Sequence, residues 1–121
     1  MPEDTHPVQD ALHEPPTVEE LEDWVRDNIK AVLAVTDETF TDIGTVIDLS
    51  VAVVGRRQRG ITPWTVAELG RLARHWHIDP RLMFSRRAAD VLSALPPTRI
   101  AQLRAPKALP ATTRSKTPVA A

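Results

Sequence analysis

Apolar residues recur every three to four positions between residues 17 and 95, which is the period of amphipathic α-helices. The first such run predicts a helix over 17–35. Thr17 and Glu20 have the spacing of a capping box, so this helix should begin directly after Thr17. Its polar positions are rich in Asp and Glu, which predicts an acidic outer face.

The next two runs predict a pair of short helices, over 40–47 and 51–59, joined by a three-residue turn. Thr39 and Ser50 are good N-caps for these helices, and Gly60 can adopt the left-handed conformation that ends a helix. The second helix is basic and too short to hide all its arginines. Two capped helices of this kind are typical of a helix-turn-helix. The residues expected to face inward are Ile43, Ile47 and Val54.

Three further helices are predicted, over 66–76, 80–84 and 86–95, the last one ending at Pro96-Pro97. The apolar stripe of 86–95 either extends the core or forms a dimer contact. We therefore expect an all-α bundle of five to six helices over 17–95. A disordered acidic arm is expected over 1–16. A flexible basic tail is expected over 96–121, with at most one helical turn at 100–103.

Composition limits the classes of function. The 121 residues include no cysteine, which excludes disulfides, thiolate nucleophiles and cysteine metal sites. No apolar run approaches the length of a membrane span. These features predict a soluble cytoplasmic protein without membrane contact.

The net charge of -1 hides a division along the chain. Residues 1–48 contain 13 Asp or Glu and 2 Lys or Arg, a net charge of -11, whereas residues 49–121 contain 3 and 13, a net charge of +10. The basic half includes the second helix of the capped pair, and a positive field there favours attraction to a polyanion.

The stretch 39–84 resembles the Cro/C1-type (Xre-like) helix-turn-helix family of phage repressors. Thr39, Ser50 and Gly60 fit its cap and closing-glycine positions, and Asp48 stands at its turn glycine. Its inward positions are matched by Ile43, Gly44, Ile47 and Val54. The resemblance implies a lambda-repressor-like fold and a sequence-specific transcriptional regulator. Such a protein would occupy an operator in double-stranded DNA at the nucleoid, as a homodimer that could pair through 86–95.

The resemblance also implies the contact residues. Base contacts fall on Val51, Ala52 and Arg56, where the methyl groups suit thymine and the guanidinium suits guanine. Contacts to the DNA backbone fall on Thr41, Arg57, Arg59 and Thr62.

Other chemistry has little support in the sequence. We find no nucleophile motif, phosphate loop or paired carboxylates, so we expect no enzyme activity, cofactor or small-molecule ligand. His75 and His77 are two residues apart and are expected to be ordinary surface histidines, with no metal site. Trp24 and Trp76 are expected in the core. Two alternatives stay open: a protein-interaction module, such as an antirepressor or host-factor inhibitor, and an antitoxin-like DNA binder.

Overall fold

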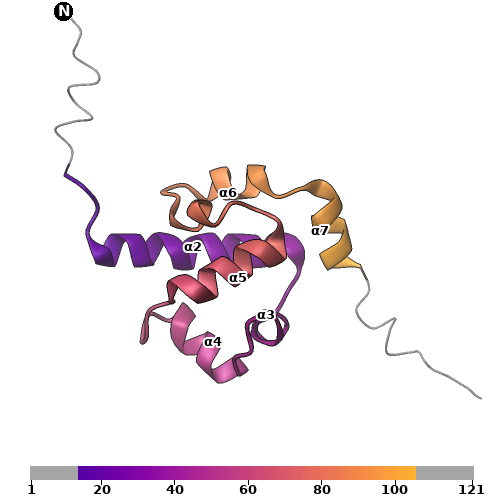
Figure 1. The fold of residues 1–121 in the computed structure, drawn as a ribbon, viewed down its shortest axis with the longest axis horizontal. Helices are drawn as coiled ribbons and strands as arrows, with labels where there is room; N and C mark the ends of the chain where they lie inside the picture. The colour runs from indigo at the N-terminus through magenta and orange to yellow at the C-terminus, as the bar shows by residue number, and fades with distance from the viewer. Residues whose placement is uncertain (1–13, 106–121) are drawn as a thin grey trace, which may run out of the picture.

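A computed structural model describes residues 14–105, which form six α-helices, one 3₁₀ helix and no strand (Figure 1). The predicted all-α class is thereby confirmed. The elements are α2 (Val18–Thr36), α3 (Phe40–Ile47), α4 (Val51–Gln58), α5 (Val66–Trp76), η1 (Pro80–Phe84, the 3₁₀ helix), α6 (Ala88–Ala94) and α7 (Pro97–Arg104).

Five of these helices begin where the sequence places a capping side chain. The first N–H groups of a helix have no partner within the helix, and a side-chain oxygen just before it can accept a hydrogen bond from one of them. In α2, α3 and α5 the third helical residue returns the bond and completes a capping box. The five capping residues are Thr17, Thr39, Ser50, Thr65 and Asp79.

The helices pack in two groups that share η1. In one group α3 contacts α4 and α5, and in the other α2 contacts α6 and α7, while η1 contacts α2, α5 and α6. In Figure 1, α3 and α4 lie below α2, α6 lies above it, and α7 lies to its right. Buried apolar residues from both groups form one core, which includes Trp76, Ile43, Leu72, Met83 and Val91.

A buried amide joins α2 to η1. Asn28 is almost fully buried, and its side-chain nitrogen donates to the backbone oxygens of Met83 at 2.9 Å and Ser85 at 2.8 Å. Because a buried polar group without partners is costly, these two bonds fix where the chain leaves η1.

The predicted sixth helix is shorter than expected and belongs to the core. It spans Ala88–Ala94, within the predicted 86–95. Val91 and Leu95 from its apolar stripe are buried, and α6 packs on α2 and η1. Of the two roles open for this stripe, the structure supports extension of the core.

The prediction of a flexible tail from residue 96 with at most one helical turn is wrong for its first part. Pro97 occupies the first turn of α7, where a proline costs nothing because its missing N–H would have no helical partner. Ile100 and Leu103 pack against the core. The guanidinium of Arg104 donates to the backbone oxygen of Val35 at 2.9 Å, near the end of α2.

The expected arm lies mostly outside the described residues, and so does the rest of the expected tail. Of the arm, 14–16 are described and form no helix or strand, and 1–13 are outside; of the tail, 106–121 are outside. Among the helices that the structure describes, none is both long enough and apolar enough to cross a membrane.

Candidate functional site

The outer face of α4 carries the three residues predicted to contact DNA bases. Val51, Ala52 and Arg56 are exposed, with 53% of the Val51 surface open to solvent. Val54 and Gly55 are buried on the opposite face. Among residues 14–105, the Arg56 side chain has no hydrogen-bond or ion-pair partner. The helix is therefore fixed from its inner side and presents an unengaged guanidinium outward.

Arg57 points the other way and binds α5. Its Nε and Nη2 donate to the two carboxylate oxygens of Glu68, at 3.0 and 2.9 Å. The same carboxylate accepts the Thr65 backbone N–H in the capping box of α5. The Arg57 hydrogen bond holds the pKa of Glu68 below its usual range, against the opposing effect of burial. Arg57 was predicted to contact DNA phosphate, but the structure gives its guanidinium a bracing role between α4 and α5.

The end of α4 is closed by its backbone and by Gln58. Gly60 is left-handed, with φ 79°, and the N–H groups of Gly60 and Ile61 donate to the oxygens of Arg57 and Arg56. This is the Schellman arrangement that the glycine predicts. Gln58 donates to the Arg26 oxygen at 3.2 Å and accepts from the Trp64 ring nitrogen at 2.8 Å. The end of α4 is thereby tied to α2 and to the following loop.

The turn between α3 and α4 depends on a close backbone approach. The Leu49 N–H donates to the Gly44 oxygen at 2.8 Å. A Cβ on Gly44 would stand 2.5 Å from the Leu49 oxygen, closer than any side chain allows. Asp48 closes α3 in the left-handed region, with φ 62°. The two helices can adopt this angle only because residue 44 has no side chain.

The remaining predicted backbone-contact residues lie near the ends of α3 and α4. Thr41 and Arg59 are exposed, whereas Thr62 is half-buried. The Arg59 side chain lies beside Gly55, where a Cβ would be 3.0 Å from its Nη1. Thr41 and Arg59 are thus accessible to solvent, and Thr62 is less so.

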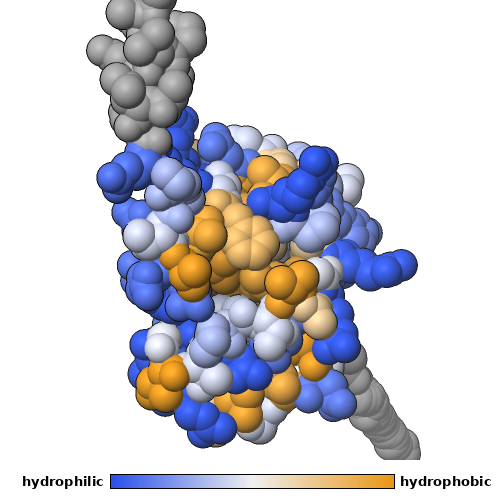
Figure 2. Space-filling model, turned by 60° about the vertical axis from the view of Figure 1, so that its left-hand side comes forward, coloured by the Kyte–Doolittle hydropathy of each residue, from blue (hydrophilic) through white to orange (hydrophobic). Residues whose placement is uncertain are grey.

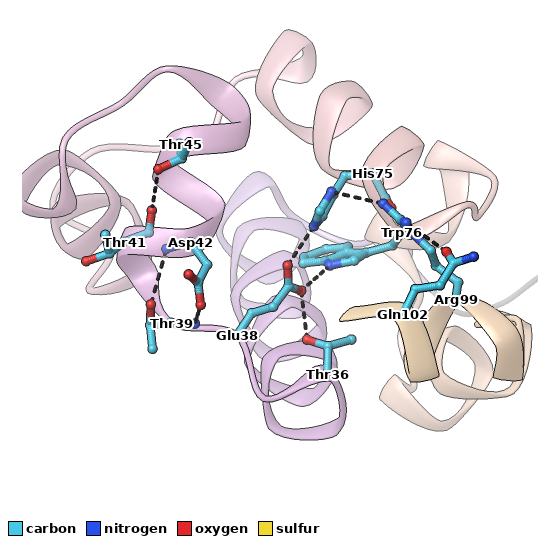
Figure 3. A network of polar contacts seen from close by, with 10 residues as sticks. All are labelled: Thr36, Glu38, Thr39, Thr41, Asp42, Thr45, His75, Trp76, Arg99 and Gln102. Atoms are coloured by element: carbon cyan, nitrogen blue, oxygen red, sulfur yellow. Dashed lines mark hydrogen bonds and ion pairs between the residues drawn. The ribbon is translucent and has the colours of Figure 1, made fainter. Parts of the chain in front are cut away.

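A buried carboxylate holds the start of α3 from behind (Figure 3). Glu38 accepts hydrogen bonds from the Thr36 hydroxyl and the Trp76 ring nitrogen, both at 2.7 Å, and its other oxygen lies 2.6 Å from Nε2 of His75. Burial raises the pKa of Glu38, but the hydrogen bonds from His75, Trp76 and Thr36 outweigh it and leave the pKa lowered. The next residue, Thr39, caps α3, so this network positions the helix that supports α4.

Arg99 extends this network to α7. Its Nε donates to the His75 backbone oxygen at 2.8 Å, and its Nη2 lies 3.4 Å from Nδ1 of the same ring. His75 is therefore a structural residue, and the expectation of an ordinary surface histidine is wrong for it. His77 is exposed at the left-handed end of α5. Within residues 14–105 no group of three or more potential ligands could hold a metal ion.

The sequence pattern predicts a role for Glu68 but gives no indication of one for Glu38. Glu68 stands in a capping-box pattern with Thr65. Glu38 stands between two helices, and its partners His75 and Trp76 follow 37 and 38 residues later, so no local pattern marks it.

Comparison with known proteins corrects the expected family. No curated protein and no solved structure matches the chain. The model of the BetR domain family matches residues 20–117, from the first turn of α2 to beyond α7. The resemblance to the Cro/C1-type family is therefore overturned by a match that covers most of the sequence. The chain belongs to the BetR domain family.

Proposed function

We propose that this protein is a transcriptional regulator that binds double-stranded DNA, with α3 and α4 as a helix-turn-helix and α4 in the major groove. One observation carries the proposal: Val51, Ala52 and Arg56 project from a helix whose inner face and both ends are fixed. A lambda-repressor-like arrangement of the helices is part of the proposal. A protein of this kind would act on the DNA of the nucleoid.

The exposed side chains on α4 suit the reading of bases. A guanidinium can donate to O6 and N7 of guanine together, and the methyl groups of Val51 and Ala52 can contact the thymine methyl group. Thr41 and Arg59 would contact phosphates and set the register of the helix. Arg57 is not part of the proposed contact because it is engaged with Glu68.

The uneven distribution of charge along the chain also supports DNA binding through α4. Net charges of -11 for residues 1–48 and +10 for residues 49–121 place the positive charge on the part of the chain that contains α4. Association with DNA releases counterions from the phosphates, so binding should weaken as the salt concentration rises.

The test is a selection of duplexes from a random library, followed by fluorescence anisotropy titrations with the selected sequence. We expect Arg56→Ala to weaken binding by about 1–3 kcal/mol and to relax the preference at one G·C pair. Arg87→Ala is the matched control. This exposed arginine precedes α6, which Figure 1 places on the opposite side of the molecule from α4. The Arg87→Ala variant should bind the selected duplex like the unaltered protein.

A protein-interaction module remains the second candidate, because the outer face of α2 is acidic. Its exposed carboxylates are Glu19, Glu20, Asp23 and Asp27. If the selection enriches no duplex, and Arg56→Ala behaves like Arg87→Ala on random DNA, then DNA reading by α4 is refuted. The acidic face of α2 would then be the surface to test against protein partners.

A further inference from the structure

An apolar groove lies outside α4, and no residue of that helix lines it. It is formed by the first turns of α2, the start of α5, the end of η1 and the ring of Trp64. It encloses about 150 Å³, similar to an engineered cavity of about 150 Å³ that binds benzene. The groove therefore has room for one branched or aromatic side chain.

Projecting apolar side chains stand at the same groove. Val66 leaves 77% of its surface exposed, Val18 64% and Phe84 38%. Figure 2 shows this face, with hydrophobic residues gathered near the point where the grey N-terminal residues begin. Such a cluster on a small domain is typical of a contact surface, because burying each exposed apolar side chain away from water lowers the free energy.

We propose that this groove is a two-fold contact with a second copy of this chain. In a two-fold contact the same patch is used by both partners, so a hollow and the side chains that fill it must lie on one face. The groove and the exposed Val18 and Val66 satisfy that condition. Val66 of each copy enters the groove of the other.

The charges of the groove favour a second copy over another partner. Among its lining residues, the ionisable ones are one acid, Glu22, and one base, Arg26. A groove that binds a strongly charged partner is expected to be lined by residues of the opposite charge. One charge of each sign suits self-pairing, because Glu22 of one copy meets Arg26 of the other twice across the axis. Arg26 also pairs with Asp23 of its own helix.

The contact would set the separation of two α4 helices, a consequence that rests on the proposed function. Trp64 of the groove donates to Gln58 at the end of α4. The Arg26 guanidinium lies beside Gly60, about 3.1 Å from where a Cβ would stand. Because these contacts tie the groove to the end of α4, the dimer would fix the spacing between two half-sites on DNA.

The first test is sedimentation equilibrium of the full chain over a range of concentrations, without DNA. We expect a reversible dimer, and Val66→Asp should raise its dissociation constant by about 100-fold, since the substitution occurs twice in the contact. Ala67→Asp is the matched control. It places the same charge in the same helical turn, at an exposed residue that does not line the groove. It should dimerise like the unaltered chain.

The second test uses opposite charge reversals. Glu22→Arg alone and Arg26→Glu alone should each weaken self-association, because like charges then meet across the axis. An equimolar mixture should form a heterodimer, since each arginine again faces a glutamate. Native mass spectrometry separates the heterodimer from the two homodimers, and circular dichroism checks that each variant folds.

Three outcomes would overturn the proposal. They are a full chain that is monomeric at every concentration, equal dimerisation by Val66→Asp and Ala67→Asp, and a mixture of charge reversals that forms no heterodimer. None of these measurements contains DNA. A dimer that binds no duplex would instead leave this proposal standing and refute the proposed function.

Discussion

Glu38 and Glu68 are both buried carboxylates that gather hydrogen bonds behind the α3–α4 pair, yet they do so with different partners. Glu68 binds a permanent charge, the Arg57 guanidinium, together with the start of its own helix. Glu38 binds two neutral donors, on Thr36 and Trp76, and a histidine that is charged only when protonated. Glu68 is a brace at the edge of the core, whereas Glu38 is part of the core.

From this difference we expect the cost of losing each carboxylate to depend on the donors that are left without a partner. Without Glu68, the Arg57 guanidinium can turn to water, since it is near the surface. Without Glu38, the Trp76 ring nitrogen and the Thr36 hydroxyl stay in an interior where both residues are fully buried. The unpaired donor, more than the lost bond, determines the destabilisation.

The largest expected effect is that of Glu38→Ala. We expect it to lower the free energy of unfolding by about 3 kcal/mol or more, because two buried donors lose their acceptor. Urea denaturation followed by circular dichroism measures this. Glu38→Gln keeps one acceptor oxygen and should cost less, and Glu19→Ala on the exposed face of α2 should change little. If Glu68→Ala destabilised the protein more than Glu38→Ala, the distinction between brace and core would be wrong.

A double-mutant cycle on Arg57 and Glu68 should give the next largest value. We expect a coupling energy of about 1.5 kcal/mol or more, because the pair is bidentate and mostly shielded from solvent. The Arg81–Asp79 pair is a matched control, since its guanidinium also contacts both carboxylate oxygens but both side chains are exposed. That pair should show no measurable coupling. Equal coupling in the two cycles would mean that burial adds nothing.

Acid should remove both contributions gradually. The pKa values of Glu38 and Glu68 are lowered in the folded protein from the usual 4.5. A carboxyl with a lowered pKa adds stability that is present above its unfolded pKa and lost as pH falls through the folded value. The free energy of unfolding should therefore decrease below about pH 4.5. Glu38→Gln and Glu68→Gln should each make that decrease shallower. If neither variant changed the slope of the unfolding free energy against pH, the decrease could not be assigned to these two carboxylates.

The smallest expected effect is in the turn between the helices that the two carboxylates support. Asp48 is left-handed, a conformation in which a Cβ is strained and glycine is not. Asp48→Gly should raise the free energy of unfolding by no more than about 0.5 kcal/mol, since glycine also gains entropy in the unfolded chain. Asp48→Val should lower it. Thermal melts of both variants test whether the turn is strained at this residue.

Local features of the fold could be predicted, and contacts between distant residues could not. The capping side chains of Thr17, Thr39 and Ser50 and the left-handed Gly60 depend only on near neighbours, so the sequence shows them. Helix α7 was missed because its sequence has a weak apolar pattern. It is held by Arg99 and Arg104, which bind backbone oxygens of α5 and α2.

The candidate site divides in the same way. The exposure of Val51, Ala52 and Arg56 agrees with the spacing around the buried Val54. The different directions of the neighbours Arg56 and Arg57 depend on Glu68, eleven residues after Arg57. The family, finally, could not be inferred from the short cap-and-core pattern, because capping and core positions specify two packed helices and not one family.

Gly44 limits which positions of this protein can be substituted without changing the angle between α3 and α4. The residue that fixes the angle between α3 and α4 cannot accept even a methyl group without moving the Leu49 carbonyl. Val51, Ala52 and Arg56, by contrast, face solvent. Their side chains could therefore be exchanged in combination while the helix keeps its place. A library randomised at these three positions, with Gly44 kept, would vary the exposed surface of α4 without rebuilding the domain beneath it.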